Sequence, residues 1–181
     1  TQKARTDGLS TMAMNHSLGK LYAVTQELGK LTMVNADGSG TPLTISIEGF
    51  TPDTTGGGPG KLHIAVNESL HRVYVFIKDV KRLNIYDGSS LSLINYSTIT
   101  QFNQTTSPLD LLYSDDAGNR LFVGPHIVNP TTGIVTGQIP TGQKLVAINP
   151  LRNKHYVFDY YTTGFNERIY EYDSTFQLVV R

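Results

Sequence analysis

The chain has 181 residues, 15 basic and 15 acidic side chains, 10 Tyr, no Cys and no Trp. The lack of cysteine excludes a disulfide-stapled fold, a thiolate zinc site and a cysteine nucleophile, and the balanced charge argues against nucleic acid as a partner. Because 39% of the residues are apolar and they are spread along the chain, we expect a globular fold. The apolar runs are too short to predict membrane insertion.

One pattern occurs four times along the chain. A strand-like stretch ends in an Asn or Asp anchor, and an aromatic residue follows seven positions later. The anchors are Asn15, Asn67, Asp115 and Asn149, and the aromatic residues are Tyr22, Tyr74, Phe122 and Tyr156. A basic residue stands two positions before each aromatic residue: Lys20, Arg72, Arg120 and Lys154. This regularity predicts a structural repeat.

Each repeat reads as four short strands in chain order. The first contains MAMN, LYAV, LTMVN and PLTISI, and the second contains IAVN, VYVF, RLNIY and LSLINYSTI. The third contains LYSD, LFVG and GIVTGQI with the shortest middle hairpin, and the fourth contains VAIN, HYVF and a last strand FQLVV. Asp-Gly turns at Asp37 and Asp87 favour hairpins, because Gly tolerates the positive φ of a tight turn. The sequence therefore predicts an all-β chain of antiparallel units.

The anchors recur every 45 residues on average, about the length of a four-stranded propeller blade. This spacing predicts a single β-propeller domain of four four-stranded antiparallel blades. Their approximate bounds are 7–54, 55–106, 107–142 and 143–181.

The repeats also resemble those of a known group of propellers. The segment GKLYAVTQELGKLTMVNADGSGTPL is similar to the YWTD pattern, and RVYVFIKDVKRLNIYDGSSLSLI is nearer to the YVTN pattern. Almost the whole chain resembles the YVTN, NHL and YWTD group of β-propellers, whose members commonly have about six to eight blades. Four blades leave two alternatives: a small ring, or an incomplete propeller that joins further blades or a second copy.

The positions around the anchors have structural interpretations. The polar anchors are expected to cap the following turn by accepting hydrogen bonds from backbone amides two residues on. Small residues two positions before three anchors, Ala13, Ala65 and Ala147, suit a crowded strand near the propeller axis. Tyr113 stands there in the third repeat, where it either fills the channel or presents its hydroxyl to a ligand.

The residues offer little catalytic chemistry. No two of the five histidines have a metal-ligand spacing, so neither a metal nor a cofactor is predicted. His155 replaces an apolar residue of the repeat and is expected to be packed or hydrogen-bonded. The resemblance implies a ligand site at the central channel, where His63 and Asp110 would lie. An alternative function is therefore a lactonase- or lyase-like enzyme that uses these two residues.

Other residues favour a binding protein. Tyr160, Tyr161 and Phe165, close to Phe158, interrupt the strand alternation and are expected to form an exposed aromatic surface for a protein or carbohydrate. Among four Asn-x-Ser/Thr sequons, Asn95 and Asn103 are the predicted glycosylation sites.

The leading hypothesis is a non-enzymatic propeller scaffold, extracellular or on the cell surface, that binds a protein or carbohydrate. Uncovered first and last blades would pair with other strands. We therefore expect a homo-oligomer, or further propeller blades that cover these edges.

Overall fold

The computed structural model describes residues 9–52, 62–102, 112–139, 143–149, 152, 154–159, 168–173 and 179. These residues form 15 β-strands joined by turns. They belong to two compact units, unit 1 up to residue 98 and unit 2 from residue 99. Among the described residues, none forms an apolar helix of membrane-spanning length.

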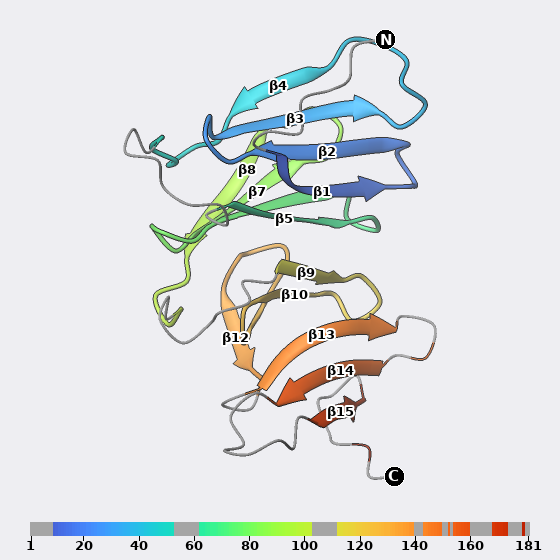
Figure 1. Cartoon of the computed structure of the whole chain (residues 1–181), viewed down its shortest axis with the longest axis vertical. Coiled ribbons are helices and arrows are strands. Elements are labelled where there is room, and N and C mark those ends of the chain that lie inside the picture. The colour runs from blue at the N-terminus through green and yellow to red at the C-terminus, as the bar shows by residue number, and fades with distance from the viewer. Residues whose placement is uncertain are drawn as a thin grey trace. The chain divides into compact units, whose positions relative to one another are not determined.

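Unit 1 contains two four-stranded antiparallel sheets (Figure 1). The first sheet consists, in spatial order, of β1 (Leu9–Asn15), β2 (Lys20–Thr25), β3 (Lys30–Asn35) and β4 (Leu43–Ser46). The second consists of β5 (Leu62–Asn67), β6 (Arg72–Ile77), β7 (Arg82–Asp87) and β8 (Leu93–Thr98). Strands that are adjacent in each sheet are thus also consecutive along the chain, as in a propeller blade.

Unit 2 repeats this arrangement. The third sheet consists of β9 (Leu112–Asp115), β10 (Arg120–Val123), β11 (His126–Val128) and β12 (Val135–Gln138). The fourth consists of β13 (Gln143–Asn149), β14 (Lys154–Asp159) and β15 (Arg168–Tyr172). Most of the predicted last strand FQLVV lies outside the described residues, but Val179 N donates to Glu171 O at 2.8 Å, as a fourth strand beside β15 would.

The anchors cap the turns between the first two strands of each sheet, but with a longer reach than predicted. Their side-chain oxygens accept from the backbone N–H three residues on, not two; the four donors are Leu18, Leu70, Gly118 and Arg152. The residue two positions on donates through its hydroxyl instead at Ser17 and Ser69. The fourth turn residue takes a positive φ, 59° at Gly19, 50° at His71 and 49° at Asn119. The three-residue reach follows from this left-handed last residue, which closes a longer turn.

The two faces of each sheet have different roles. We call the face that carries the aromatic residue of the repeat the leading face, and we call the opposite face of the same sheet the trailing face. The leading face of the first sheet packs on the trailing face of the second in one apolar cluster. The leading face contributes Tyr22, Val24, Leu31 and Met33, and the trailing face contributes Ile64, Val66, Val73, Val75 and Tyr86. Full burial of one such side chain contributes about 2 kcal/mol.

Polar bonds join the same two sheets. Tyr22 is fully buried, and its hydroxyl donates to Gly88 O at 2.7 Å. The Gln26 amide forms two bonds with the backbone of Leu62: Nε2 donates to the carbonyl at 2.6 Å and Oε1 accepts from the N–H at 2.8 Å. Gln26 therefore satisfies both polar groups of the first residue of β5.

The sheets of unit 2 pack by the same rule. The leading face of the third sheet carries Phe122, Tyr113 and Ile127. The trailing face of the fourth sheet carries Val157, Tyr170 and Tyr172. All six side chains lie in one apolar cluster with Ile139.

Candidate functional site

A charged cluster lies within unit 2, where the third and fourth sheets meet. Asp115 ends β9, and its cross-strand partner Arg120 begins β10. His155 is the second residue of β14 and lies on the trailing face, next to Val157 of the apolar cluster. The anchor turn thus places a carboxylate and a guanidinium at a sheet end, and the next sheet supplies an imidazole.

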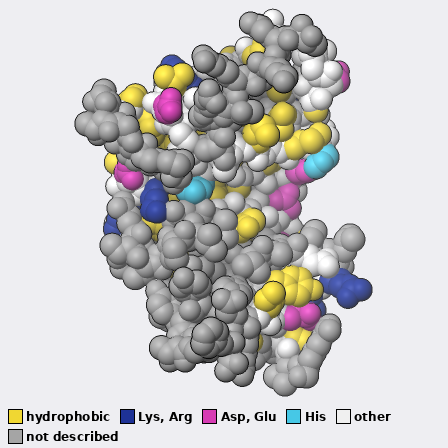
Figure 2. All heavy atoms as spheres, viewed as in Figure 1, with side chains coloured by type: hydrophobic (Ala, Val, Ile, Leu, Met, Phe, Trp, Pro, Cys, Tyr) yellow, Lys and Arg dark blue, Asp and Glu magenta, His cyan; other side chains and the backbone are white. Residues whose placement is uncertain are grey.

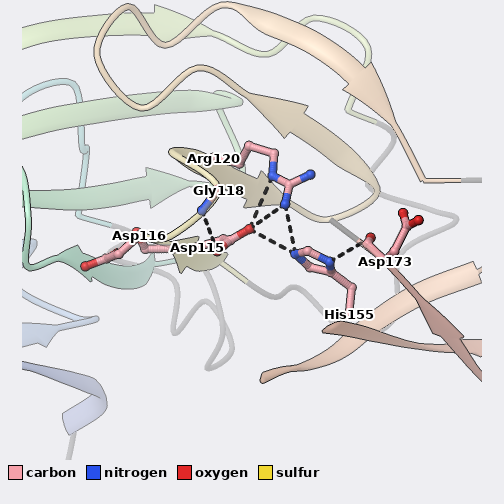
Figure 3. Close-up of polar contacts among 7 residues, drawn as sticks. Asp115, Asp116, Gly118, Arg120, His155 and Asp173 are labelled. Carbon is pink, nitrogen blue, oxygen red and sulfur yellow. Dashed lines mark hydrogen bonds and ion pairs between the residues drawn. The ribbon is translucent and has the colours of Figure 1, made fainter. Parts of the chain in front are cut away.

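One carboxylate oxygen holds the cluster together (Figure 3). Asp115 Oδ2 accepts from Arg120 Nη2 at 2.7 Å and from His155 Nε2 at 2.9 Å. The other oxygen, Oδ1, accepts from the Gly118 N–H at 3.0 Å. His155 Nδ1 donates to the backbone oxygen of Asp173 at 3.2 Å. A carbonyl and a carboxylate both accept, so each ring nitrogen of His155 faces a hydrogen-bond acceptor.

The electrostatics of Asp115 follow from this geometry. Burial alone raises the pKa of the carboxyl group, but hydrogen bonds from His155, Gly118 and Arg120, together with the Arg120 charge, outweigh it. The pKa of Asp115 therefore falls from 3.8 to about 2. The carboxylate is ionised at every physiological pH and balances part of the surrounding positive charge.

The chemistry of this cluster is structural. An Asp–His pair can serve acid–base catalysis where substrate reaches the imidazole. Here the side chains of His155 and Asp115 are 0% and 1% exposed, so solvent and substrate do not reach the pair. We interpret the cluster as a polar lock between the third and fourth sheets.

The sequence carries a signal for this lock. Asp115 is the one anchor that is not Asn, and His155 is the one polar residue in its repeat position, where Leu21, Val73 and Leu121 stand in the other repeats. These two departures occur in neighbouring repeats. Packing of a leading face on the next trailing face brings them together. The predicted hydrogen-bonded role of His155 is confirmed, whereas its partner was not predicted.

The predicted catalytic pair is described only in part. His63 lies on β5, is partly buried and is the cross-strand partner of Phe76. Asp110 lies outside the described residues, so its pairing with His63 stays a prediction. Across the described ranges, no group of three or more His, Asp and Glu side chains is arranged to hold a metal ion.

The predicted ligand-binding aromatic residues have different outcomes. Tyr113 is partly buried beside Phe122, and burial raises the pKa of its hydroxyl. A ligand role for that hydroxyl stays a prediction. Tyr160, Tyr161 and Phe165 lie outside the described residues.

One of the two predicted glycosylation sites lies in the second sheet. Asn95 is exposed on β8, the outermost strand of that sheet. Its side-chain oxygen accepts from the Tyr96 N–H at 2.8 Å. Asn103 lies outside the described residues.

The trailing face of the first sheet is a second candidate site, suited to binding a macromolecule. It carries Met12 and Met14, which are 62% and 38% exposed, with the partly buried Leu21, Ala23 and Val34 beside them. Hydrophobic side chains reach the surface over this sheet in Figure 2. The equivalent residues of the second sheet are buried or partly buried in the apolar cluster of unit 1. An apolar patch that is exposed on a sheet face is typical of an interaction surface.

Comparison with known proteins finds likeness in structure only. No family model matches the chain, and no curated protein matches its sequence. Hydrazine synthase from Kuenenia stuttgartiensis is similar with a TM-score of 0.65 and 12% identity, over 99% of this chain and 50% of that one. BamB from Moraxella catarrhalis is similar with a TM-score of 0.54 and 12% identity, over 91% and 46%.

A chain of the nidogen/laminin complex is similar with a TM-score of 0.56 and 12% identity, over 93% of this chain and 61% of that one. The chain thus spans about half the length of these structures. They are β-propeller proteins, and one of them is part of a protein complex. The four antiparallel sheets and these likenesses together show that the chain is a β-propeller-repeat protein.

Proposed function

We propose that the chain is a non-enzymatic propeller scaffold that binds a protein through the trailing face of its first sheet. The observation that carries this proposal is the exposure of Met12 and Met14 on a face whose equivalent in the second sheet is packed. Burial of a Met side chain contributes about 2 kcal/mol. A partner that covers both residues therefore gains a substantial part of a binding free energy.

The chemistry of the face fits a protein partner. Its side chains are mainly thioethers, aliphatic groups and the hydroxyls of Thr32 and Thr44, which bond to each other at 2.9 Å. At one end of the face the Lys30 ammonium donates to the Ser46 hydroxyl at 2.7 Å. Met adapts its shape to a contacting surface because it is unbranched. Other β-propeller proteins of similar structure occur in complexes, including the nidogen/laminin complex.

We further propose that the protein works outside the cell or on its surface. The exposed sequon at Asn95 supports this placement, because glycan addition requires an accessible Asn in the secretory pathway. The lack of cysteine is compatible with an oxidising compartment, since no thiol is present to be oxidised.

A photo-crosslinking residue at position 12 tests the scaffold. The full chain carrying it is illuminated in an extract that combines the cells that produce the protein with their surrounding medium, and the adducts are identified by mass spectrometry. Leu28 provides the matched control position, because it is also 62% exposed and lies in the turn after β2, away from the face.

We expect protein adducts at position 12 in excess over position 28. Met14→Lys should reduce them, because it places a charge in the middle of the contact. Equal adducts at positions 12 and 28 would refute the proposed binding face.

A further inference from the structure

We propose that the partner of the trailing face of the first sheet is a second copy of this chain, bound through the leading face of its fourth sheet. This inference rests on the proposed function and adds the identity of the partner. The two surfaces are different, so the contact is heterologous and propagates from copy to copy.

The first argument is that one packing rule operates in both units. Within unit 1, a leading face packs on the trailing face of the next sheet, and the same holds within unit 2. In each case an aromatic residue at the repeat position enters the contact, Tyr22 in one unit and Phe122 in the other. Each repeat thus has two kinds of surface. Its leading face, here called the donating surface, contributes an aromatic residue to the contact, and its trailing face, here called the accepting surface, packs against that residue.

The second argument is that the first sheet has an accepting surface that is exposed. Counted from the anchors, Met12, Met14, Leu21 and Val34 occupy the positions of Ile64, Val66, Val73 and Tyr86. Those four residues of the second sheet are buried or partly buried against a leading face. The trailing face of the first sheet therefore has the apolar pattern of a surface that receives a blade.

The third argument is that the fourth sheet has a matching donating surface. Its leading face carries the repeat aromatic Tyr156, with Glu171 as the cross-strand partner. Ile169 lies on the same face and is 66% exposed. Lys154 and Glu171 form an ion pair at 3.5 Å, so the face carries charges of both signs. Each of the two charges keeps its counter-ion when the face is covered, so neither is buried unpaired.

A specific hydrogen bond is expected in the new contact. In unit 1 the Tyr22 hydroxyl donates to Gly88 O. Ala36 occupies the position of Gly88 in the first sheet, since its N–H donates to Gly19 O as that of Gly88 donates to His71 O, both at 2.8 Å. By the same geometry, the Tyr156 hydroxyl of one copy should donate to Ala36 O of the next.

Analytical ultracentrifugation of the full chain tests the inference with two surface variants. M12K/M14K blocks the accepting surface, and I169K blocks the donating surface. Because Met12 and Ile169 are exposed, these changes should leave each fold intact, which circular dichroism verifies. L28K is the matched control for an exposed apolar residue off the face.

Wild type and L28K should assemble, each blocked variant should be monomeric, and an equimolar mixture of the two should restore a dimer through their intact surfaces. Y156F should weaken assembly about fivefold to tenfold. A wild-type monomer at about 100 μM, a weak but detectable regime, would overturn the inference. Assembly of I169K alone would also overturn it, because the contact would then not use the fourth sheet.

These outcomes are separable from failure of the scaffold. If purified chains stay monomeric while position 12 forms adducts with another protein in the extract, the scaffold stands and the second copy is excluded. If position 12 forms no excess adducts and the chain is monomeric, both proposals fail.

Discussion

Replacing Asp115 by Asn tests the polar lock with little change of shape. Asn is the anchor at the equivalent positions 15, 67 and 149, and each of those residues caps its turn by accepting a backbone N–H. D115N should therefore keep the bond from Gly118. What it removes is the charge that faces Arg120 and His155.

The cost follows from the surroundings of the carboxylate. A pKa lowered from 3.8 to about 2 corresponds to about 2 kcal/mol of stabilisation of the ionised form. The substitution also leaves Arg120 Nη2 and His155 Nε2, which are 3.3 Å apart, without the anion between them. Removal of one partner from a buried ion pair costs about 3 to 5 kcal/mol. We expect D115N to lower the free energy of unfolding of unit 2 by about 3 kcal/mol.

Urea unfolding followed by circular dichroism measures this cost, and hydrogen exchange of amides in β9 and β10 assigns it to unit 2. D116N is the control, because its amide oxygen can still accept from the Ser114 hydroxyl, a 2.7 Å bond in the native chain. Its effect should stay below about 1 kcal/mol.

The pH dependence gives a second readout. Since folding lowers the pKa of Asp115, its contribution is present above pH 4 and is lost as the pH falls from about 4 to about 2. The difference between wild type and D115N should shrink over that range. A loss below about 1 kcal/mol at neutral pH, or a difference that does not change with acid, would refute the account of the lock.

Three further substitutions test other contacts. Y22F should lower the stability of unit 1 by about 1 to 2 kcal/mol in thermal unfolding, because Gly88 O loses its donor. Burial, with the Asp87 charge, raises the pKa of Tyr22 to about 12, so wild type but not Y22F should lose this stability as the pH rises from about 10 to about 12. Q26A should cost about 2 kcal/mol, since both backbone groups of Leu62 lose their partner, whereas E27A at an exposed neighbour should be neutral. In secretory expression, N95Q should remove one glycan from the intact mass; an unchanged mass would contradict glycosylation at Asn95.

Much of the fold could be predicted from the repeat alone. The anchors and the aromatic residues seven positions later gave the number and order of the sheets, because turn residues and strand alternation act over a few neighbouring positions. Each anchor side chain accepts from the N–H three residues on instead of two, and this was not predicted because it depends on the left-handed residue that ends the turn. Gly19 suggests such a residue, but His71 does not.

The candidate sites were harder to predict because they depend on contacts between repeats. Asp115 and His155 are 40 residues apart, and neither residue alone distinguishes a lock from a solvated turn. The exposure of the trailing face could not be predicted either, because Met12 and Met14 have the pattern of ordinary strand residues. Their exposure indicates a binding face only when they are compared with the equivalent residues of the second sheet, which are packed in the apolar cluster of unit 1.

The hydrogen bond from Tyr22 to Gly88 also has a consequence for how the chain folds during synthesis. The bond joins residues 66 positions apart, and at about 10 residues per second the ribosome needs about 7 s to make that stretch. During this interval the nascent first sheet exposes Tyr22, Val24 and Leu31, which are fully buried in the finished protein. Translational slowing between residues 22 and 88 lengthens this exposure and should therefore increase aggregation of the nascent chain.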